Sequence, residues 1–373
     1  MGQSFSLKNN TIDLRRKKRN KHDILFRGKN MEKKWNWGII STGRIAAKFA
    51  DQLPQSTTGI LYAVASRTKE KAEEFARLHN APRDYGSYEE LLRDPLVDIV
   101  YIATPHPMHA EWAMKAAEAG KHILCEKPLT INSREARGVI DAARRHDVFL
   151  MEAFHYRCHP QTAKLLELIR ERVIGDVRVI QASFSFNGEY NLAHRTLNHA
   201  LGGGGILDVG CYPVSLARLV AGAALGLDFA EPLKVEGCGM IGNKSRVDEY
   251  AVASLEFPAG ILAQISCGVQ LHQENVVQIY GTKGRIIIPF PWVVSINGGI
   301  SKVIVQKDGE KDPWEIQVTA DQGLFAIEAD TACRFIPHRQ AKPPAMSWED
   351  SLGNMKTLDM WREAIGLHYD FEK

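Results

Sequence analysis

The sequence predicts an α/β fold in two parts, a doubly wound parallel sheet followed by an α+β domain with an open, mainly antiparallel sheet. Between residues 35 and 155, short apolar runs alternate with helical segments, which is typical of a parallel sheet covered by helices on both faces. After residue 155, long runs of alternating polarity follow one another with few helices between them. The chain has 373 residues, 45% hydrophobic and 24% charged, which is the size and composition of a two-domain globular protein.

The elements of the first half follow from the apolar runs and the turns between them. Strands are expected at residues 37–40, 59–66, 97–103, 122–125 and 148–152. A glycine turn after residue 40 opens the first helix, and further helices are expected at 69–78, 109–119 and 133–146. Gly120 closes the third of these helices.

The second half is expected to begin with a helix at 160–172 and to continue as a sheet. Strands are expected at 177–186, 234–241, 247–257, 260–271, 275–281 and 284–289, and helices near 321–337 and 348–366. The residues Gly281 to Gly284 predict a hairpin turn. Six antiparallel strands form an open sheet, which must cover one of its faces. The segment's own helices can cover one face and another copy of the chain the other, so we expect a homodimer or a higher homo-oligomer.

Positive charge is concentrated at the start of the chain, where residues 1–34 carry eleven Lys and Arg against three Asp and Glu. The remainder has a net charge of −5, so we expect no nucleic-acid partner. The leader lacks periodicity and is expected to be disordered. It begins with Met1 to Ser6 in a pattern that fits N-myristoylation. The alternative is an upstream extension, with Met31 as the natural start.

Membrane and metal sites are not expected. No stretch of about 18 residues is both apolar and free of charge, and no apolar region follows the leader as in a secretory signal. The six cysteines lie singly, which indicates reduced thiols and a cytoplasmic protein. The cluster of His155, Cys158 and His159 lacks a fourth ligand at a recognisable spacing.

A strand that enters a glycine turn and then a helix predicts a dinucleotide site, because N–H groups at the helix N-terminus face the pyrophosphate. The motif is Ser41-x-Gly43-x-x-Ala46, where G-x-G-x-x-G is usual. Ala46 allows close packing of helix on strand, whereas Ser41 departs from the pattern because glycine normally makes this tight turn. We therefore expect a Rossmann domain at 35–155. The cofactor-binding residues of the turn would be Ser41, Thr42, Gly43, Arg44 and Ile45.

The end of the second strand favours NADP(H) over NAD(H). The strand ends in Ser66-Arg67-Thr68, without the carboxylate that usually accepts a hydrogen bond from the ribose 2′-hydroxyl. Arg67 can instead bind a 2′-phosphate through charge-assisted hydrogen bonds. The alternative is that Arg67 is a solvated turn residue.

Two later segments carry residues suited to proton transfer. Lys127 directly follows a strand in the run Glu126-Lys127-Pro128, which places it at the ligand crevice. Four glycines at 202–205 precede Asp208 and Tyr212, which are four residues apart on one face of a helix start. Hydride transfer between a carbinol carbon and nicotinamide needs a group that exchanges the hydroxyl proton. A tyrosine can do this where a nearby ammonium favours its phenolate. The alternative is a core aromatic beside a solvated lysine.

Together these motifs resemble the glucose–fructose oxidoreductase/inositol dehydrogenase/MocA-like (Gfo/Idh/MocA) family over residues 35–367. The marks are the Ser41–Ala46 turn, Ala103–His109, Glu126–Pro128, Phe154–Arg157 ending at Pro160, and Gly202–Tyr212. Residues 85–91 and 151–153 are most similar to the subgroup of dimeric dihydrodiol dehydrogenases and NADP-dependent D-xylose dehydrogenases.

The resemblance implies a catalytic Lys127, a proton-transferring Tyr212 and an orienting Asp208. The expected cofactor-lining residues are Ser66, Arg67, Thr104, Pro105, His109, Glu126 and Lys127, with Arg157 at the nicotinamide end. Residues 156–373 would bind the substrate and form the homodimer, and the C-terminal helix could pack back on the first domain. The substrate would be a sugar or a trans-dihydrodiol. Two alternatives stay open, a nucleotide-sugar ketoreductase and a non-catalytic NADP(H)-sensing protein.

Overall fold

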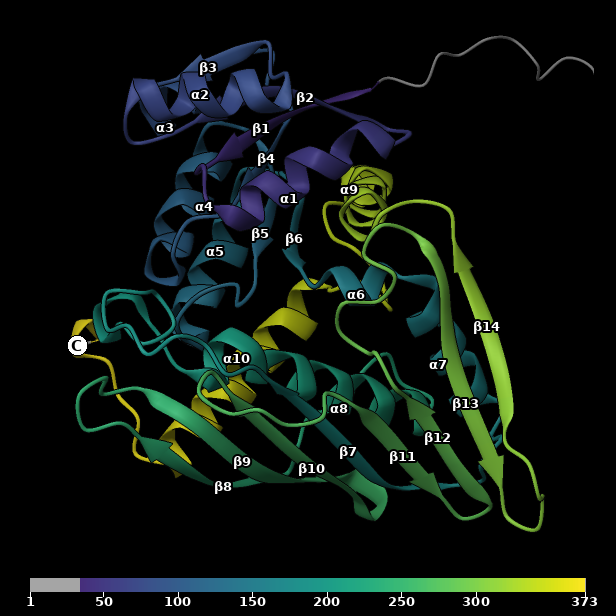
Figure 1. The fold of residues 1–373 in the computed structure, drawn as a ribbon. Coiled ribbons are helices and arrows are strands. Elements are labelled where there is room, and N and C mark those ends of the chain that lie inside the picture. The colour runs from purple at the N-terminus through teal and green to yellow at the C-terminus, as the bar shows by residue number, and fades with distance from the viewer. Residues whose placement is uncertain (1–33, 373) are drawn as a thin grey trace, which may run out of the picture. The chain divides into compact units, whose positions relative to one another are not determined.

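The computed structural model describes residues 34–372, in which two sheets and their helices are arranged as Figure 1 shows. The predictions of disorder and myristoylation in the leader lie outside the described residues.

The first sheet has six parallel strands in the order β3-β2-β1-β4-β5-β6, which confirms the predicted doubly wound fold. Its strands are β1 (Trp35–Ile40), β2 (Gly59–Ala65), β3 (Arg83–Tyr85), β4 (Ile99–Ile102), β5 (His122–Glu126) and β6 (Leu150–Ala153). Its helices are α1 (Arg44–Gln52), α2 (Lys69–His79), α3 (Tyr88–Arg93), α4 (His109–Glu118) and α5 (Ser133–Arg145). The strand order reverses between β1 and β4, and a ligand crevice is expected at that point.

The second sheet has eight strands in the order β14-β13-β12-β11-β7-β10-β9-β8. They are β7 (Val177–Ser185), β8 (Lys234–Ile241), β9 (Asp248–Phe257), β10 (Ile261–Gly268), β11 (Val277–Gly281), β12 (Gly284–Ile288), β13 (Gly299–Lys307) and β14 (Trp314–Ala320). Six were predicted, and the hairpin from β11 to β12 is confirmed. The prediction of a mainly antiparallel sheet is confirmed, with β7 paired to β10 in parallel, and the expected number of strands is corrected because β13 and β14 extend the sheet.

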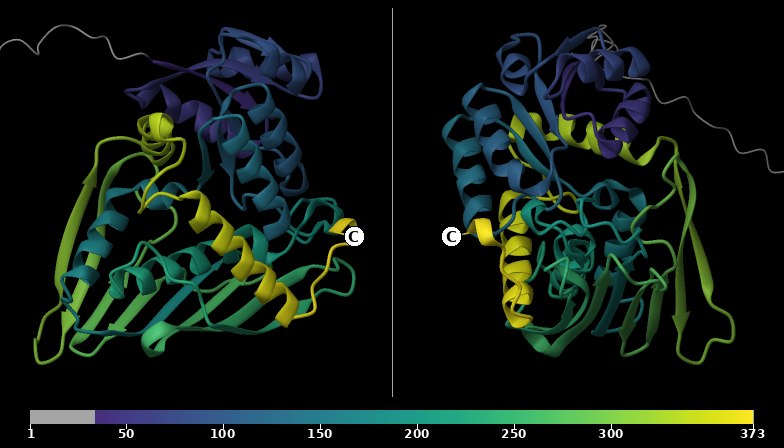
Figure 2. Two further views of the ribbon diagram at one scale, coloured as in Figure 1. Left: turned by 180° about the vertical axis from the view of Figure 1, so that it is seen from behind. Right: turned by 60° about the vertical axis from the view of Figure 1, so that its left-hand side comes forward.

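Helices cover one face of this second sheet, as both views in Figure 2 show. They are α7 (Pro160–Arg170), α8 (Cys211–Ala224) and α10 (Trp348–Ala364), and α8 is buried except at its end. By length and composition the segment His199–Ala224 could cross a membrane, but its apolar window is wholly buried among the described elements. This segment is therefore best interpreted as a core helix.

Two C-terminal helices reach back to the first sheet. The helix α9 (Leu324–Phe335) joins the core that contains β1 and α1, where Phe325 and Ala329 are buried in one cluster with Phe49. The helix α10 is tied to α5 by a hydrogen bond from the Ser133 amide to the Asp359 carboxylate (2.8 Å). Elements from both ends of the chain therefore frame the crevice between the two sheets.

Candidate active site

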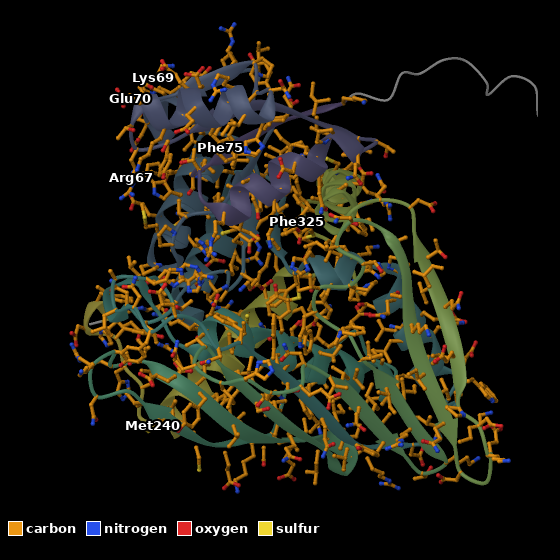
Figure 3. The ribbon with its side chains drawn as sticks, viewed as in Figure 1. Arg67, Lys69, Glu70, Phe75, Met240 and Phe325 are labelled. Atoms are coloured by element: carbon orange, nitrogen blue, oxygen red, sulfur yellow. The ribbon has the colours of Figure 1, made fainter. Side chains whose placement is uncertain are left out.

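A cavity of about 1040 Å³ opens at the carboxyl ends of β1, β2, β4 and β5. Of the fifteen site residues predicted from the sequence, fourteen line it. These are Ser41, Thr42, Gly43, Arg44, Ile45, Ser66, Arg67, Thr104, Pro105, His109, Glu126, Lys127, Asp208 and Tyr212. Arg67 and Phe325, both lining residues, are labelled in Figure 3 and lie well apart, so the cavity is extended.

One end of the cavity is the turn between β1 and α1. Ser41 adopts φ 101°, a conformation that favours glycine and costs a serine about 1–3 kcal/mol. Its amide donates to the Ala65 carbonyl (3.0 Å), and the Thr42 and Ser66 hydroxyls lie 3.2 Å apart, which fixes the turn to the end of β2. The turn therefore keeps the glycine-type shape although a serine occupies the first position.

The N-terminus of α1 is suited to an anion. Gly43 is the N-cap, no side chain caps the helix, and its first turn carries no acidic residue. A Cβ built on Gly43 would contact the Ser41 hydroxyl at 3.8 Å and no other atom within 4 Å, so the space beside it is open. Open amide groups and a positive helix end fit a pyrophosphate.

Arg67 follows β2 at the same end of the cavity, next to Thr68 and Lys71. Within residues 34–372 no carboxylate forms an ion pair with Arg67. Burial raises the pKa of the neighbouring Tyr88, and the positive charge of Arg67 partly opposes that shift. The guanidinium is therefore available for an anionic ligand group.

At the other end of the cavity, the segment after β5 presents Glu126 and Lys127. The Tyr101 hydroxyl donates to the Glu126 carboxylate, and burial raises the pKa of Glu126 despite the nearby Lys127. Glu152 on β6 accepts from the Leu129 amide (2.8 Å) and thereby anchors the segment. The cavity wall is thus held from the adjacent strand.

The glycine segment is shaped by a buried acid. Gly204 has φ +115°, and a Cβ there would lie 2.0 Å from Asp248 Oδ1, so only glycine fits. Asp248 Oδ2 accepts from the Ile206 amide (2.6 Å). The chain then forms a π-helical turn, η4 (Ile206–Gly210), before α8 begins. Such turns are frequent at functional sites, and this one carries Asp208 into the cavity.

Asp208 accepts hydrogen bonds from two cationic side chains, Arg195 and Lys127. Arg195 donates to its carboxylate (Nη1 to Oδ1, 2.8 Å), and Lys127 donates to its main-chain oxygen and lies 3.4 Å from Oδ1. Burial opposes ionisation of Asp208, but Arg195 and Lys127 outweigh it and hold the pKa of the carboxyl well below its usual value. The carboxylate stays ionised and can accept a further hydrogen bond.

Tyr212 is 4% exposed, and its hydroxyl oxygen lies 3.3 Å from His155 Nε2. Aromatic rings surround it, namely Phe154, Tyr156, Phe184 and Trp292. Burial raises its pKa well above 10, and neighbouring acids add to the shift. Lys127 Nζ lies 5.2 Å from the centre of the ring, while its hydrogen bonds go to Asp208. The ammonium therefore lies near the phenol ring, as expected, and directs its hydrogen bonds to Asp208.

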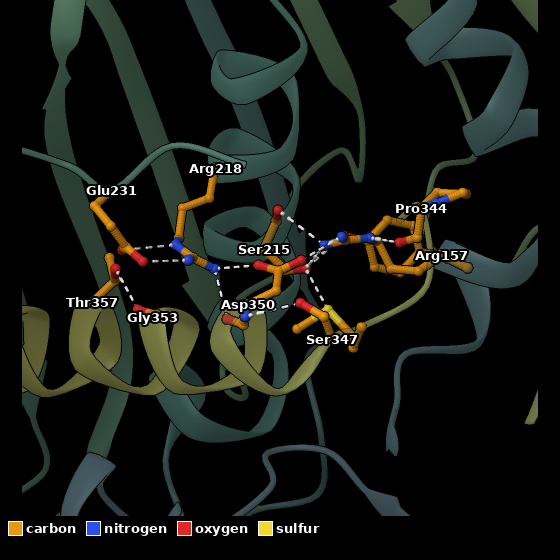
Figure 4. A network of polar contacts seen from close by, with 11 residues as sticks. Arg157, Ser215, Arg218, Glu231, Pro344, Ser347, Asp350, Gly353 and Thr357 are labelled. Atoms are coloured by element: carbon orange, nitrogen blue, oxygen red, sulfur yellow. Dashed lines mark hydrogen bonds and ion pairs between the residues drawn. The ribbon is translucent and has the colours of Figure 1, made fainter. Parts of the chain in front are cut away.

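Arg157 is the predicted site residue that the structure places elsewhere. It belongs to α6 (His155–Cys158), is fully buried, and bonds to Asp350 (Nη2 to Oδ2, 2.6 Å) and to the Ser215 hydroxyl (2.7 Å). Arg218 binds the other oxygen of Asp350 (2.6 Å), so two arginines share one carboxylate (Figure 4). Arg157 fixes α6 to α8 and α10 and does not line the cavity.

Several lining residues are not among the fifteen predicted site residues, although His194 was one of two alternative proton donors. Arg195 and His194 come from the irregular segment before the glycines, and His194 Nε2 lies 3.3 Å from Arg44 Nη2 across the cavity. Phe325 comes from α9, far along the chain. Irregular backbone and distant helices leave no local pattern that could have indicated these residues. Within residues 34–372, no group of three or more His, Cys, Asp or Glu could hold a metal ion.

The chain matches two models of one family. An oxidoreductase family model with an NAD-binding Rossmann fold, GFO_IDH_MocA, matches residues 35–154, and the C-terminal domain model of GFO/IDH/MocA matches residues 162–287.

Individual proteins agree with this match. The trans-1,2-dihydrobenzene-1,2-diol dehydrogenase of Xenopus laevis is 35% identical over 343 residues, which is 89% of this chain and 98% of the relative. The human enzyme of the same name is 36% identical over 347 residues, 90% of this chain and 98% of the relative. KijD10, a 3-ketoreductase from Actinomadura kijaniata solved with NADP and TDP-benzene, is 26% identical with a TM-score of 0.77, and the match covers 89% of this chain and 98% of that one.

Proposed function

The chain belongs to the GFO/IDH/MocA oxidoreductase family, and from that premise we propose that it is an NADP(H)-dependent dehydrogenase of a trans-dihydrodiol or a sugar. One observation carries the proposal: Lys127, Asp208 and Tyr212 converge at one end of a cavity whose other end holds Arg67. The dihydrodiol dehydrogenases that match about nine tenths of the chain support a diol substrate.

The cofactor would lie along the cavity. The amides at 43–45 would hold the pyrophosphate, and Arg67 would hold the 2′-phosphate of NADP. The Thr104 hydroxyl is buried at the cavity wall without a hydrogen-bond partner in the described structure, which suits a polar group of the cofactor. When bound, nicotinamide supplies or accepts the hydride.

Tyr212 and the residues around it would carry out the proton transfer. The buried hydroxyl of Tyr212 would donate a proton to the substrate oxygen in reduction and take it back in oxidation. The ionised Asp208 would accept a hydrogen bond from a second substrate hydroxyl. Lys127 would bind both Asp208 and the reacting oxygen and so fix their relative positions. The aromatic rings around Tyr212 would keep water away from this end.

A second candidate is the reduction of a keto group on a nucleotide-linked sugar. The 3-ketoreductase KijD10 shares 26% identity and was also solved with single replacements of a lysine and of a tyrosine. Those two residues are separated along their chain by nearly the same number of residues as Lys127 and Tyr212 here. This spacing supports a shared proton-transfer pair, whatever the substrate.

We place the cofactor in residues 35–155 and the substrate in residues 156–373. We also propose a homodimer formed through the face of the second sheet that its helices leave open. Exposed apolar side chains lie on the outer strands β8 to β10, namely Met240, Tyr250, Val252 and Leu262, and Figure 3 labels Met240 there. The free cysteines suit a reducing compartment such as the cytoplasm.

A screen of NADP⁺ reduction over trans-diols, aldoses and inositols tests the proposed function, with NADPH oxidation by keto sugars as the reverse assay. Turnover of a diol or sugar is expected. Tight NADPH binding without turnover in either direction would favour the cofactor-sensing alternative.

A further inference from the structure

His155 contacts the hydroxyl that the proposed reaction depends on. It begins α6, lines the same cavity, and its Nε2 lies 3.3 Å from the Tyr212 hydroxyl oxygen. Both side chains are more than nine-tenths buried, His155 at 8% and Tyr212 at 4% exposed. This hydrogen bond is shielded from water, so its direction affects the chemistry of the phenol.

The surroundings of the ring decide which nitrogen carries the proton. Burial lowers the pKa of His155 to about 3, so the imidazole is neutral at pH 7 and has a single N–H. Within the described structure, Nδ1 is buried and has no hydrogen-bond partner. A proton on Nδ1 would be a buried, unpaired N–H, which is rarer and costlier than a bare acceptor. The favoured tautomer therefore carries its proton on Nε2, toward Tyr212.

The ring has little freedom to turn away. Its plane meets the ring of Phe325 edge-on, at 75° and 5.3 Å between centroids. Two residues further on, Arg157 is held by Asp350 and Ser215, so the turn that carries His155 is anchored (Figure 4). His155 is therefore held in place by its packing against Phe325 and by the ion pair of Arg157 that anchors α6.

We infer that His155 is a positioning residue for Tyr212: its Nε2–H donates to the phenol oxygen, which directs the tyrosine's own proton into the cavity and stabilises the phenolate after that proton has left. This inference rests on the proposed function in assigning Tyr212 the proton transfer. In oxidation the hydride leaves for NADP⁺ and the hydroxyl proton passes to the phenolate oxygen. In reduction both move back, and His155 keeps its own proton throughout.

The other groups around Tyr212 explain why a donor is needed. Four acidic groups face it from β5, η4, α8 and α9 and raise its pKa, namely Glu126, Asp208, Cys211 and Glu328. The charge of Tyr212 in turn raises the pKa of Tyr101 on β4. Two positive charges lie near Tyr212, namely Lys127 over its ring and Arg195 beside Asp208. Since Lys127 directs its hydrogen bonds to Asp208, His155 supplies the donor that the hydroxyl itself contacts.

The test compares three replacements of His155. His155→Phe and His155→Met fill the space without a donor, whereas His155→Gln can place an amide N–H near the position of Nε2. The first two should raise the apparent pKa in the pH profile of kcat for oxidation by about one unit, lower kcat near neutral pH about tenfold, and recover at high pH. His155→Gln should stay near the wild type. The dissociation constant of NADPH should not change in any of them.

A second readout does not depend on turnover. The tyrosinate absorbance of each protein with NADP⁺ bound, minus that of its Tyr212→Phe version, isolates the ionisation of Tyr212. The pH at the midpoint of this ionisation should rise in His155→Phe and His155→Met and should stay at the wild-type value in His155→Gln. Unchanged midpoints in the Phe and Met variants, or equal shifts in all three, would overturn the inference. If no substrate is found, this titration still tests His155 while the proposed function alone fails.

Discussion

The two ends of the cavity are built in opposite ways. At the cofactor end, Gly43 and Arg67 lie close together in sequence, and neither a capping side chain nor an ion pair within the described residues satisfies them. At the substrate end, Lys127 lies 81 residues before Asp208 in the chain, and Lys127, Asp208 and Tyr212 are bonded mainly to other residues of the protein. Groups that lack a partner within the protein can bind a charged ligand. Groups that are hydrogen-bonded to one another are held in the positions that proton transfer requires.

Replacing the proton-transferring group should damage the substrate end alone. Tyr212→Phe removes the hydroxyl and keeps the ring in its aromatic surroundings, so kcat should fall by about 10²–10⁴. NADPH affinity and melting temperature should stay close to those of the wild type. Tyr280→Phe, a change on β11 away from the cavity, is the control. Near-normal kcat on the best substrate would move the proton donor to another residue.

Lys127→Met tests whether the substrate end works as one unit. The change keeps the apolar stem and removes the charge, leaving Asp208 paired with Arg195. Turnover should fall by a factor similar to that of Tyr212→Phe, and the remaining activity should shift to higher pH. Because the two groups act together, the double variant should lose far less than the product of the two single losses. Fully multiplicative losses would show that they act independently.

Arg67→Ala should affect the cofactor end alone. A charge-assisted contact with phosphate contributes about 1.5–3 kcal/mol, so NADP(H) affinity should fall about ten- to a hundredfold while NAD(H) affinity is spared. Binding titrations of both cofactors measure this effect, with Arg77→Ala, an exposed change on α2, as the control. Equal affinities for the two cofactors in the wild type would refute the predicted preference.

A smaller effect is expected on stability, through the acid that supports the glycine segment. Burial raises the pKa of Asp248 to about 7, so the folded protein keeps a proton that the unfolded chain releases above about pH 4. This contribution to stability is complete below pH 4 and is lost as the pH rises through 7. Asp248→Asn cannot ionise, so its melting temperature should fall less than that of the wild type between pH 5 and 7.

The difference should correspond to about 1–2 kcal/mol over that interval. Thermal unfolding at several pH values measures it, with the exposed Asp321→Asn as the control. A parallel pH dependence in the wild type and Asp248→Asn would mean that Asp248 does not change its protonation.

The sequence predicted the cofactor end of the cavity better than the substrate end. The turn at Ser41–Ile45 and the position of Arg67 depend on neighbouring residues, so local patterns were sufficient to locate them. The position of Arg157 outside the cavity lining could not be predicted locally, because its partner Asp350 lies 193 residues further along the chain. Strand β14 was missed although its residues alternate between apolar and polar, and it lies mostly exposed at the edge of the sheet. The partnership of Asp208 with Arg195 crosses an irregular segment that has no periodicity to analyse.

The carboxylate shared by Arg157 and Arg218 also limits how the protein can change over evolution. Losing Asp350 leaves the buried Arg157 without a carboxylate and Arg218 with Glu231 alone, and losing either arginine leaves one Asp350 oxygen without its cation, so each single change is destabilising. An uncharged replacement for the whole set can be equally stable, but it requires several substitutions at once. The helix α8, which carries Tyr212 and Arg218, is therefore expected to diverge slowly among descendants of this chain, while the open cofactor turn can vary one residue at a time.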